Sequence, residues 1–142
     1  MQPVQGSLNA AAVLFLVLHS ITDLRERRIY MGILLLQLMT GIAVRYAVGC
    51  SAIAVPAAFL PGLAAFVISL LTREALGRGD AYVLLILGVY CPLPLQLAAI
   101  TMSFPFLWIS IAVCKAGRKV ISSWPYLPFL LLGYLTALGL YR

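Results

Sequence analysis

The chain alternates between long apolar runs and short stretches that carry nearly all of its charged residues. Apart from Asp23, the residues Asp, Glu, Lys and Arg are absent from 1–24, 29–44, 46–72, 81–114 and 120–141. A helix needs about 20 mainly apolar residues to cross a bilayer, and about 17–25 are tolerated. The pattern predicts helices at 5–22, 29–48, 52–72, 81–97, 98–114 and 124–141. The expected fold is all-α, a polytopic membrane protein with about six transmembrane helices in one bundle.

Prolines and small residues refine this expectation. The charge-free run from 81 to 114 is too long for one helix, and Pro92 and Pro94 favour a turn near its middle. Three further prolines fall inside expected helices, where a proline produces a kink: Pro56, Pro61 and Pro105. Small residues let membrane helices approach closely, and the candidates here are Gly62, Ala64 and Ala65.

The overall composition is that of a membrane protein. Hydrophobic residues make up 63% of the chain and charged residues 10%, and the mean hydropathy is +1.06, which excludes an ordinary soluble domain. No linker, repeat or low-complexity tract interrupts the pattern, so residues 1–142 are expected to form a single membrane-embedded domain. The first apolar run has no preceding Lys or Arg and no cleavage pattern after it, so it is not expected to be a cleavable signal peptide.

The basic residues indicate how the bundle lies in the membrane. With six spans, the polar breaks after the first, third and fifth share one face and hold eight of the ten Lys and Arg residues: Arg25, Arg27, Arg28, Arg73, Arg78, Lys115, Arg118 and Lys119. The positive-inside rule makes this face cytoplasmic and puts both termini outside. Arg45 falls at the other face, where its side chain is expected to extend toward the membrane surface. The net charge of +6 favours anionic lipid headgroups as partners and, because the basic residues are few and scattered, not nucleic acid.

All four acidic residues fall on that same face, although the assignment uses Lys and Arg alone: Asp23, Glu26, Glu74 and Asp80. A carboxylate near the hydrocarbon costs roughly 2.5–3.5 kcal/mol on insertion scales and is a functional-site hypothesis by default. Asp23 ends one apolar run and Asp80 begins another, so the two are expected to approach each other at similar depth.

Two adjacent carboxylates are the machinery of aspartyl hydrolysis. They share a proton because both cannot comfortably ionise, and their titrations split. The ionised member takes a proton from water, which attacks the scissile carbonyl, while the protonated member polarises that carbonyl and later protonates the leaving amine. The sequence does not assign these roles between Asp23 and Asp80, since a coupled pair has shared pKa values. Gly77 and Gly79 would let a substrate strand come close to Asp80.

Each aspartate also has a simpler interpretation. Asp80 has the residue type and position of a helix N-cap before Ala81. Asp23 lies at a helix carboxyl end, where the macrodipole disfavours an anion, but it has Arg27 four residues later as a possible surface partner. Their occurrence together on one face is more specific than either residue alone.

Three motifs of this chain resemble the type IV prepilin peptidases, a prokaryotic family of membrane aspartyl peptidases. The first runs from Asp23 through Leu24-Arg25-Glu26-Arg27-Arg28-Ile29-Tyr30-Met31, similar to the family's Asp followed by basic residues and an Ile-Pro-Asn-like stretch. The second is Gly77-Arg78-Gly79-Asp80 opening a helix, and the third is Pro128-Phe129-Leu130 followed by Gly133. The resemblance covers nearly the whole chain and implies that Asp23 and Asp80 are the catalytic pair.

The chain departs from the family pattern at two positions and in length. Tyr30 replaces the expected Pro, and Tyr82 replaces a Lys that often follows the second Asp. The paired Cys-x-x-Cys motifs of longer members are absent, so the chain resembles the short, peptidase-only form, and the resemblance leaves open the methyltransferase activity of longer members.

The resemblance also implies a substrate, a partner and a location. The substrate would be a prepilin or pseudopilin of a type IV pilus or protein secretion system, with a short basic leader cut at the cytoplasmic face of a prokaryotic cytoplasmic membrane. Glu26 and Glu74 are on the correct face to bind such a leader, although charge balance with neighbouring arginines explains them equally well.

The remaining polar residues point to no cofactor or metal. Cys50, Cys91 and Cys114 are too far apart in sequence for a metal site and are expected to be buried and unpaired, although a Cys50–Cys91 disulfide is conceivable. His19, one helical turn before Asp23, is expected to be satisfied by helix packing and is not assigned to the catalytic set.

Other functions fit parts of the pattern. Presenilin-like intramembrane proteases also use Gly-x-Gly-Asp, and would cut within a transmembrane segment. A small proton-coupled transporter would use Asp23 and Asp80 as proton relays, and a non-catalytic pilus or secretion assembly factor would only retain the fold.

Overall fold

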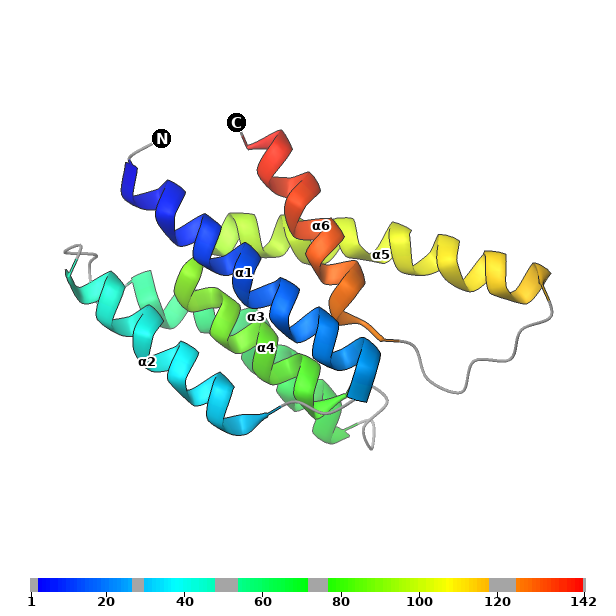
Figure 1. Ribbon diagram of the computed structural model, residues 1–142, viewed down its shortest axis with the longest axis horizontal. Coiled ribbons are helices and arrows are strands. Elements are labelled where there is room, and N and C mark those ends of the chain that lie inside the picture. The colour runs from blue at the N-terminus through cyan, green and yellow to red at the C-terminus, as the bar shows by residue number, and fades with distance from the viewer. Residues whose placement is uncertain (1–2, 27–29, 48–53, 72–76, 118–124, 142) are drawn as a thin grey trace.

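The computed structural model describes residues 3–26, 30–47, 54–71, 77–117 and 125–141, and these residues form helices joined by short turns (Figure 1). The helices are α1 (Pro3–Glu26), α2 (Met31–Ala47), α3 (Ala54–Leu71), α4 (Arg78–Tyr90), α5 (Leu93–Ala116) and α6 (Leu127–Leu140). The predicted all-α fold and the number of helices are therefore confirmed. Each long apolar run of the sequence contributes one helix, except the run from 81 to 114, which contributes two.

The boundary between the fourth and fifth helices was predicted at 97–98, and this position is wrong. The chain turns at Cys91 and Pro92, where the backbone is extended, with φ −127° and ψ 152° at Cys91 and φ −68° and ψ 151° at Pro92. A residue before proline disfavours the α conformation, so α4 ends there and Pro94 falls in the tolerated first turn of α5. As a result α4 has only 13 residues and α5 has 24.

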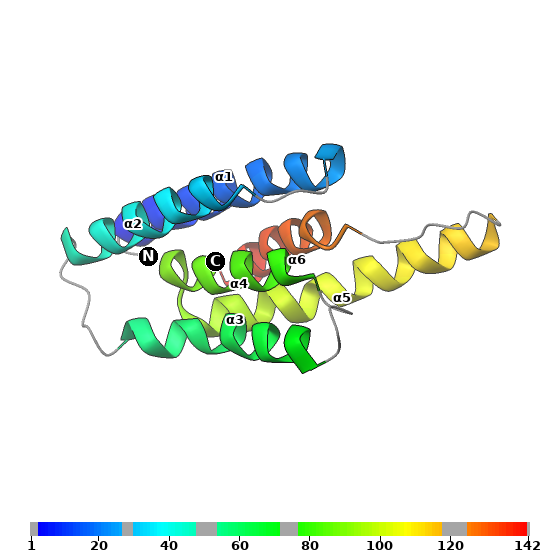
Figure 2. The ribbon, with the colours of Figure 1, turned by 90° about the horizontal axis from the view of Figure 1, so that it is seen from below.

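The helices lie in three layers with α4 in the centre. Figure 2 shows α1 and α2 on one side, α3 and α5 on the other, and α4 and α6 between them. Helix α4 packs against α1, α2, α3 and α5, and α6 packs mainly against α5 and α1. Most side chains of α4 are therefore buried: Ala81, Val83, Leu84, Ile86, Leu87, Val89 and Tyr90. A short helix can sit at the centre because its neighbours cover it on all sides.

Glycines bring the helix backbones close together at two interfaces. A Cβ on Gly62 of α3 would overlap the backbone of Leu85 in α4, and one on Gly88 of α4 would overlap the carbonyl of Ala58 in α3. A Cβ on Gly133 of α6 would overlap the backbone of α5. Among the small residues expected at these contacts, Gly62 is buried and Ala65 is 7% exposed, but Ala64 is exposed and that expectation is wrong.

Among the residues that the structure describes, two helices are long and apolar enough to cross a bilayer. These are α1, over Gln5–Arg25, and α5, while α2, α6 and residues Pro56–Leu71 of α3 are shorter apolar helices. The carboxyl half of α5 extends beyond the rest of the bundle (Figures 1 and 2). It presents large apolar side chains that no other described helix covers, including Trp108, Ile109 and Val113.

Arg45 was expected to extend toward the membrane surface, and this expectation is wrong. It is 8% exposed, and its Nε donates a hydrogen bond of 2.5 Å to the carbonyl oxygen of Val89. Val89 lies in the last turn of α4, where carbonyl groups lack partners within the helix. The arginine therefore binds α2 to the carboxyl end of α4 instead of reaching toward water.

Candidate active site

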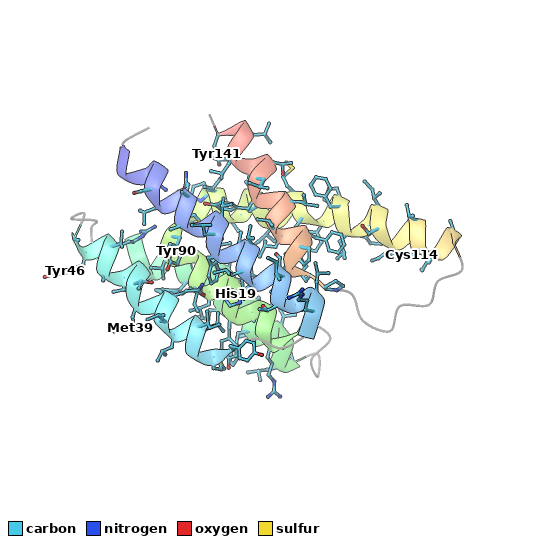
Figure 3. All side chains as sticks on the ribbon, viewed as in Figure 1. His19, Met39, Tyr46, Tyr90, Cys114 and Tyr141 are labelled. Atoms are coloured by element: carbon cyan, nitrogen blue, oxygen red, sulfur yellow. The ribbon has the colours of Figure 1, made fainter. Side chains whose placement is uncertain are left out.

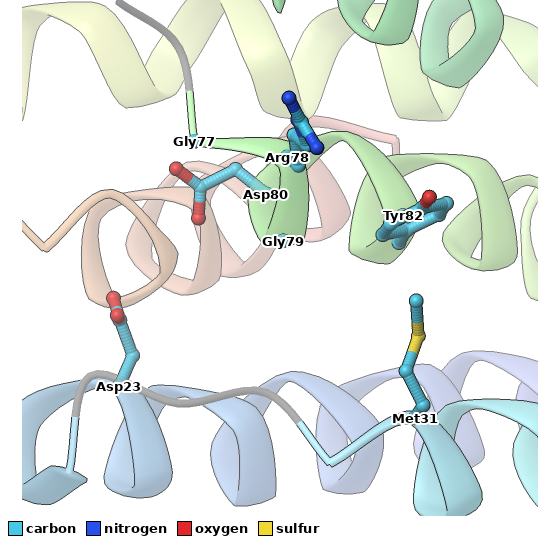
Figure 4. Close-up of a pocket in the computed structure, with 7 residues that line it drawn as sticks. All are labelled: Asp23, Met31, Gly77, Arg78, Gly79, Asp80 and Tyr82. Atoms are coloured by element: carbon cyan, nitrogen blue, oxygen red, sulfur yellow. The ribbon is translucent and has the colours of Figure 1, made fainter. Parts of the chain in front are cut away.

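Asp23 and Asp80 come from different helices and line one pocket. Asp23 lies in the last turn of α1 and Asp80 in the first turn of α4, and both are half-buried. Figure 4 shows their carboxyl groups pointing toward each other from opposite walls. The pocket has a volume of about 440 Å³ and is lined by Asp23, Met31, Gly77, Arg78, Gly79, Asp80 and Tyr82. Four of these seven residues were singled out from the sequence as site residues: the two aspartates and the two glycines.

The Gly-Arg-Gly-Asp segment forms the start of α4. Gly77 is the N-cap residue, with φ −57° and ψ 132°, and no side chain caps the helix. The interpretation of Asp80 as the helix cap is therefore wrong, since Asp80 is the third residue of α4. A Cβ on Gly77 would lie 3.1 Å from Oδ2 of Asp80. The missing side chain at Gly77 thus leaves room for the Asp80 carboxyl group where it faces the pocket.

The environment of Asp80 changes its acidity. Burial raises the pKa of Asp80 from 3.8 to about 7, and the negative charge of Asp23 contributes to this shift. The position of Asp80 at a helix amino terminus acts in the opposite direction, because the macrodipole favours an anion there. Because the pKa of Asp80 is raised overall, burial has a stronger effect on it than the helix macrodipole. Asp80 therefore titrates near neutral pH, where an ordinary carboxyl group is fully ionised.

Three pocket residues were not assigned to the site from the sequence: Met31, Arg78 and Tyr82. Met31 begins α2 and Tyr82 lies in the second turn of α4, and Figure 4 shows them facing each other beside the aspartates. Tyr82 follows Asp80 by two residues, which is the position where the family pattern often has Lys. The sequence therefore indicated that Tyr82 lies near Asp80. It did not indicate that Met31, which is on another helix, lies opposite Tyr82.

Some of the predicted contacts lie outside the described residues. Glu74 and Arg27 are among these, and Glu26 is described only as the last residue of α1. The possible Asp23–Arg27 pair and the position of the two glutamates relative to the pocket are accordingly not part of the described site. Cys50 also lies outside it, whereas Cys91 is a free buried cysteine whose Sγ donates to the carbonyl oxygen of Leu87 at 3.2 Å.

His19 lies inside the bundle and is held by packing, as expected (Figure 3). It is 2% exposed, its Nε2 lies 2.7 Å from Oε1 of Gln37, and its ring packs edge-on against Phe15 with the centroids 4.8 Å apart. It is not among the residues that line the pocket. Within the described part of the chain, no three His, Cys, Asp or Glu side chains gather as a metal site would require.

Comparison with known proteins adds a family to this geometry. Residues 10–113 match the model of the type IV leader peptidase family, a range that contains both aspartates and the whole Gly-Arg-Gly-Asp segment. Neither the curated proteins nor the solved structures contain a significant match. The family match covers most of the chain, in agreement with the resemblance that the motifs around Asp23 and Asp80 indicate. This chain belongs to the type IV leader peptidase family.

Proposed function

We propose that the protein is a membrane aspartyl endopeptidase that removes the short basic leader of type IV prepilin-like proteins. The observation that carries this proposal is the pocket in which Asp23 and Asp80 face each other (Figure 4). Two adjacent carboxyl groups, one ionised and one protonated, are the requirement for acid–base hydrolysis of a peptide bond. Membership of a leader peptidase family supports the same reaction class.

The raised pKa of Asp80 favours one assignment of the two roles. Because burial raises the pKa of Asp80 to about 7, Asp80 is the member suited to hold the proton. Asp23 then acts as the base and takes a proton from the attacking water, whose oxygen adds to the scissile carbonyl carbon. Asp80 donates a hydrogen bond to the carbonyl oxygen, and a proton passes to the leaving amine as the carbon–nitrogen bond breaks. Gly77 and Gly79 leave space for the substrate backbone beside Asp80.

The site would face the cytoplasm in a multi-pass membrane protein. The exposed residues Arg25 and Arg78 lie near the two aspartates, at the end of the bundle where α1 ends and α4 begins (Figure 1). This charge supports a cytoplasmic position for that end by the positive-inside rule. A prepilin or pseudopilin would then present its leader at the inner membrane surface. No cofactor is required by this mechanism.

Cleavage of a co-expressed candidate prepilin tests the proposal. The wild-type protein should convert the substrate to a form shorter by the leader, and Asp23→Asn and Asp80→Asn should each abolish the conversion. Elution of the detergent-solubilised variants at the wild-type volume would exclude loss of folding as the cause. Full cleavage by either variant would exclude the paired mechanism, and proton-coupled uptake without cleavage would favour the transporter.

The leader-binding role of Glu26 and Glu74 is a separate part of the proposal. Their carboxylates would attract the basic residues of the leader at the cytoplasmic face. A Glu26→Gln, Glu74→Gln double variant should therefore cleave a basic leader with a higher KM. Normal processing by the double variant would remove this role while leaving the proposed chemistry intact.

A further inference from the structure

Helix α1 carries Asp23, but its main neighbour in the bundle takes no part in the aspartate pocket. Helix α1 packs mainly against α6, whereas the described residues that line the pocket belong to α1, to α2, and to α4 with its N-cap Gly77. Asp23 lies in the last turn of α1, where carbonyl groups lack partners within the helix and the turn opens easily. The distance between Asp23 and Asp80 therefore depends on what holds the end of α1 to α2 and α4.

Four side chains inside the bundle join these three helices. They are Phe15 and His19 of α1, Gln37 of α2 and Tyr90 of α4, and Figure 3 labels His19 and Tyr90. Nε2 of His19 donates a hydrogen bond of 2.7 Å to Oε1 of Gln37, since an amide oxygen only accepts. The hydroxyl of Tyr90 donates to the backbone carbonyl oxygen of Gln37 at 2.6 Å. Phe15 closes the cluster, because its ring lies edge-on to His19 at 4.8 Å and stacks on Tyr90 at 5.8 Å.

The part of this cluster between α2 and α4 is fixed by close packing. A Cβ on Gly41 would lie 2.9 Å from Cγ1 of Val89, so the two helices touch at this level. The hydrogen bond from Arg45 of α2 to the carbonyl oxygen of Val89 holds the same interface. Gln37 therefore presents its side chain from a firmly held pair of helices, and His19 is the residue of α1 that binds it.

His19 and Asp23 lie on the same face of α1. They are four residues apart, which is about one helical turn and about 6 Å along the helix axis. A rotation or shift of α1 at His19 is therefore transmitted directly to Asp23. His19 does not line the pocket, so it acts on the reaction only through the position of Asp23.

We propose that His19, through its hydrogen bond to Gln37, is a positioning residue that sets the distance between the carboxyl groups of Asp23 and Asp80. This inference rests on the proposed peptidase function and adds to it a residue outside the pocket. The rate is sensitive to this distance, because a displacement of about 1 Å at a reacting group lowers a rate about a hundredfold. Binding of the substrate is less sensitive, since the pocket-lining residues themselves do not change.

His19→Leu removes the hydrogen-bond donor and keeps an apolar side chain inside the bundle. It should lower kcat by a factor of about ten to a hundred and leave KM within about twofold of the wild-type value. Gln37→Leu should have the same effect, and the double variant should be no worse than either single variant, because both remove one interaction. His19→Gln restores an amide donor close to the position of Nε2 and should recover most of the lost kcat.

The pH profile of kcat reports the position of Asp23 independently of stability. The negative charge of Asp23 contributes to the raised pKa of Asp80, so this contribution falls if α1 moves away. The other titratable or charged groups near Asp80 in the described residues are not on α1: Arg78, Tyr82 and Tyr126. The alkaline limb of the profile, which follows loss of the Asp80 proton, should therefore shift to lower pH in His19→Leu.

Asn9→Leu is the matched control. Asn9 is a buried polar residue of the same helix, and its side chain accepts a hydrogen bond of 3.3 Å from the hydroxyl of Tyr134 in α6. It is 14 residues from Asp23, or about 21 Å along α1. Asn9→Leu should lower the melting temperature about as much as His19→Leu, but it should change neither kcat nor the pH profile. Equal losses of kcat in the two variants would overturn the proposal, because His19 would then have only a structural role.

A distance measurement tests the positioning without a substrate. Spin labels attached to Leu24→Cys and Arg78→Cys, two exposed positions beside the aspartates, would be compared in a protein that lacks its native cysteines. The distance distribution should be narrow with His19 present and with Asn9→Leu, and broader or longer with His19→Leu. An unchanged distribution, or an unchanged kcat in His19→Leu, would overturn the proposal while leaving the peptidase function intact. If the wild-type protein cleaves no substrate, the peptidase function fails, and the spin labels still decide whether His19 holds the end of α1.

Discussion

The burial of Asp80 predicts that the stability of the protein falls as the pH rises. The pKa of Asp80 is 3.8 in an exposed chain and about 7 in the folded protein, mainly because burial disfavours the charged form. Between these two values the folded state holds a proton that the unfolded state releases. The contribution of Asp80 is therefore fully favourable below pH 3.8 and is progressively lost up to about pH 7.

The size of the effect follows from the difference in proton affinity. Each pKa unit, a tenfold change in proton affinity, corresponds to about 1.36 kcal/mol. The difference between a pKa of 3.8 in the unfolded chain and about 7 in the folded protein therefore amounts to about 4 kcal/mol. This is a large fraction of the stability of an ordinary domain, which is about 5–15 kcal/mol. Asp80→Asn keeps the shape of the side chain but does not ionise, so it should remove most of this pH dependence.

Thermal unfolding in detergent measures the prediction. The melting temperature of the wild-type protein should fall between pH 4 and pH 8, and that of Asp80→Asn should fall much less, so that the variant is the more stable protein at pH 8. In Asp23→Asn the titration of Asp80 should move to lower pH but remain above its ordinary value, because burial is a larger cause than the charge of Asp23. Parallel melting curves for wild type and Asp80→Asn across this pH range would refute the reasoning.

Two further predictions concern the packing of the bundle and use the same unfolding measurement. Gly62→Ala adds a Cβ that overlaps the backbone of Leu85, so it should destabilise the protein by about 1–3 kcal/mol. As a control, Gly139→Ala adds a Cβ that meets no atom within 4 Å, so it should be neutral or stabilising by up to about 1 kcal/mol. Equal losses of stability in Gly62→Ala and Gly139→Ala would contradict the close approach of α3 and α4. Arg45→Met removes the charged donor to the carbonyl of Val89 and should cost about 1.5–3 kcal/mol, with a smaller loss for Arg45→Lys; an unchanged melting temperature for Arg45→Met would show that this bond contributes little.

The fold class could be predicted because each apolar run is a local property of the chain. The turn in the 81–114 run was predicted from Pro92 and Pro94, but the helix boundary was placed at 97–98, five residues after Pro92, where the structure has it. The approach of Asp23 and Asp80 could be predicted because helices that cross alternately bring every second loop to the same end. Arg45 was misjudged because its hydrogen-bond partner, Val89, is 44 residues away in the sequence.

The sequence by itself determined the helical class and the family, and it singled out Asp23 and Asp80 as candidate site residues. These depend on composition, on the lengths of apolar runs and on short motifs, all of which involve residues close together in the chain. Only the tertiary structure decided that α4 lies at the centre, that Met31 faces Tyr82, and that His19 of α1 binds Gln37 of α2. The physical reason is that these features depend on which helices pack together and on where glycines allow two helix backbones to come into close contact. That choice arises from side-chain contacts between distant segments, which no local pattern specifies.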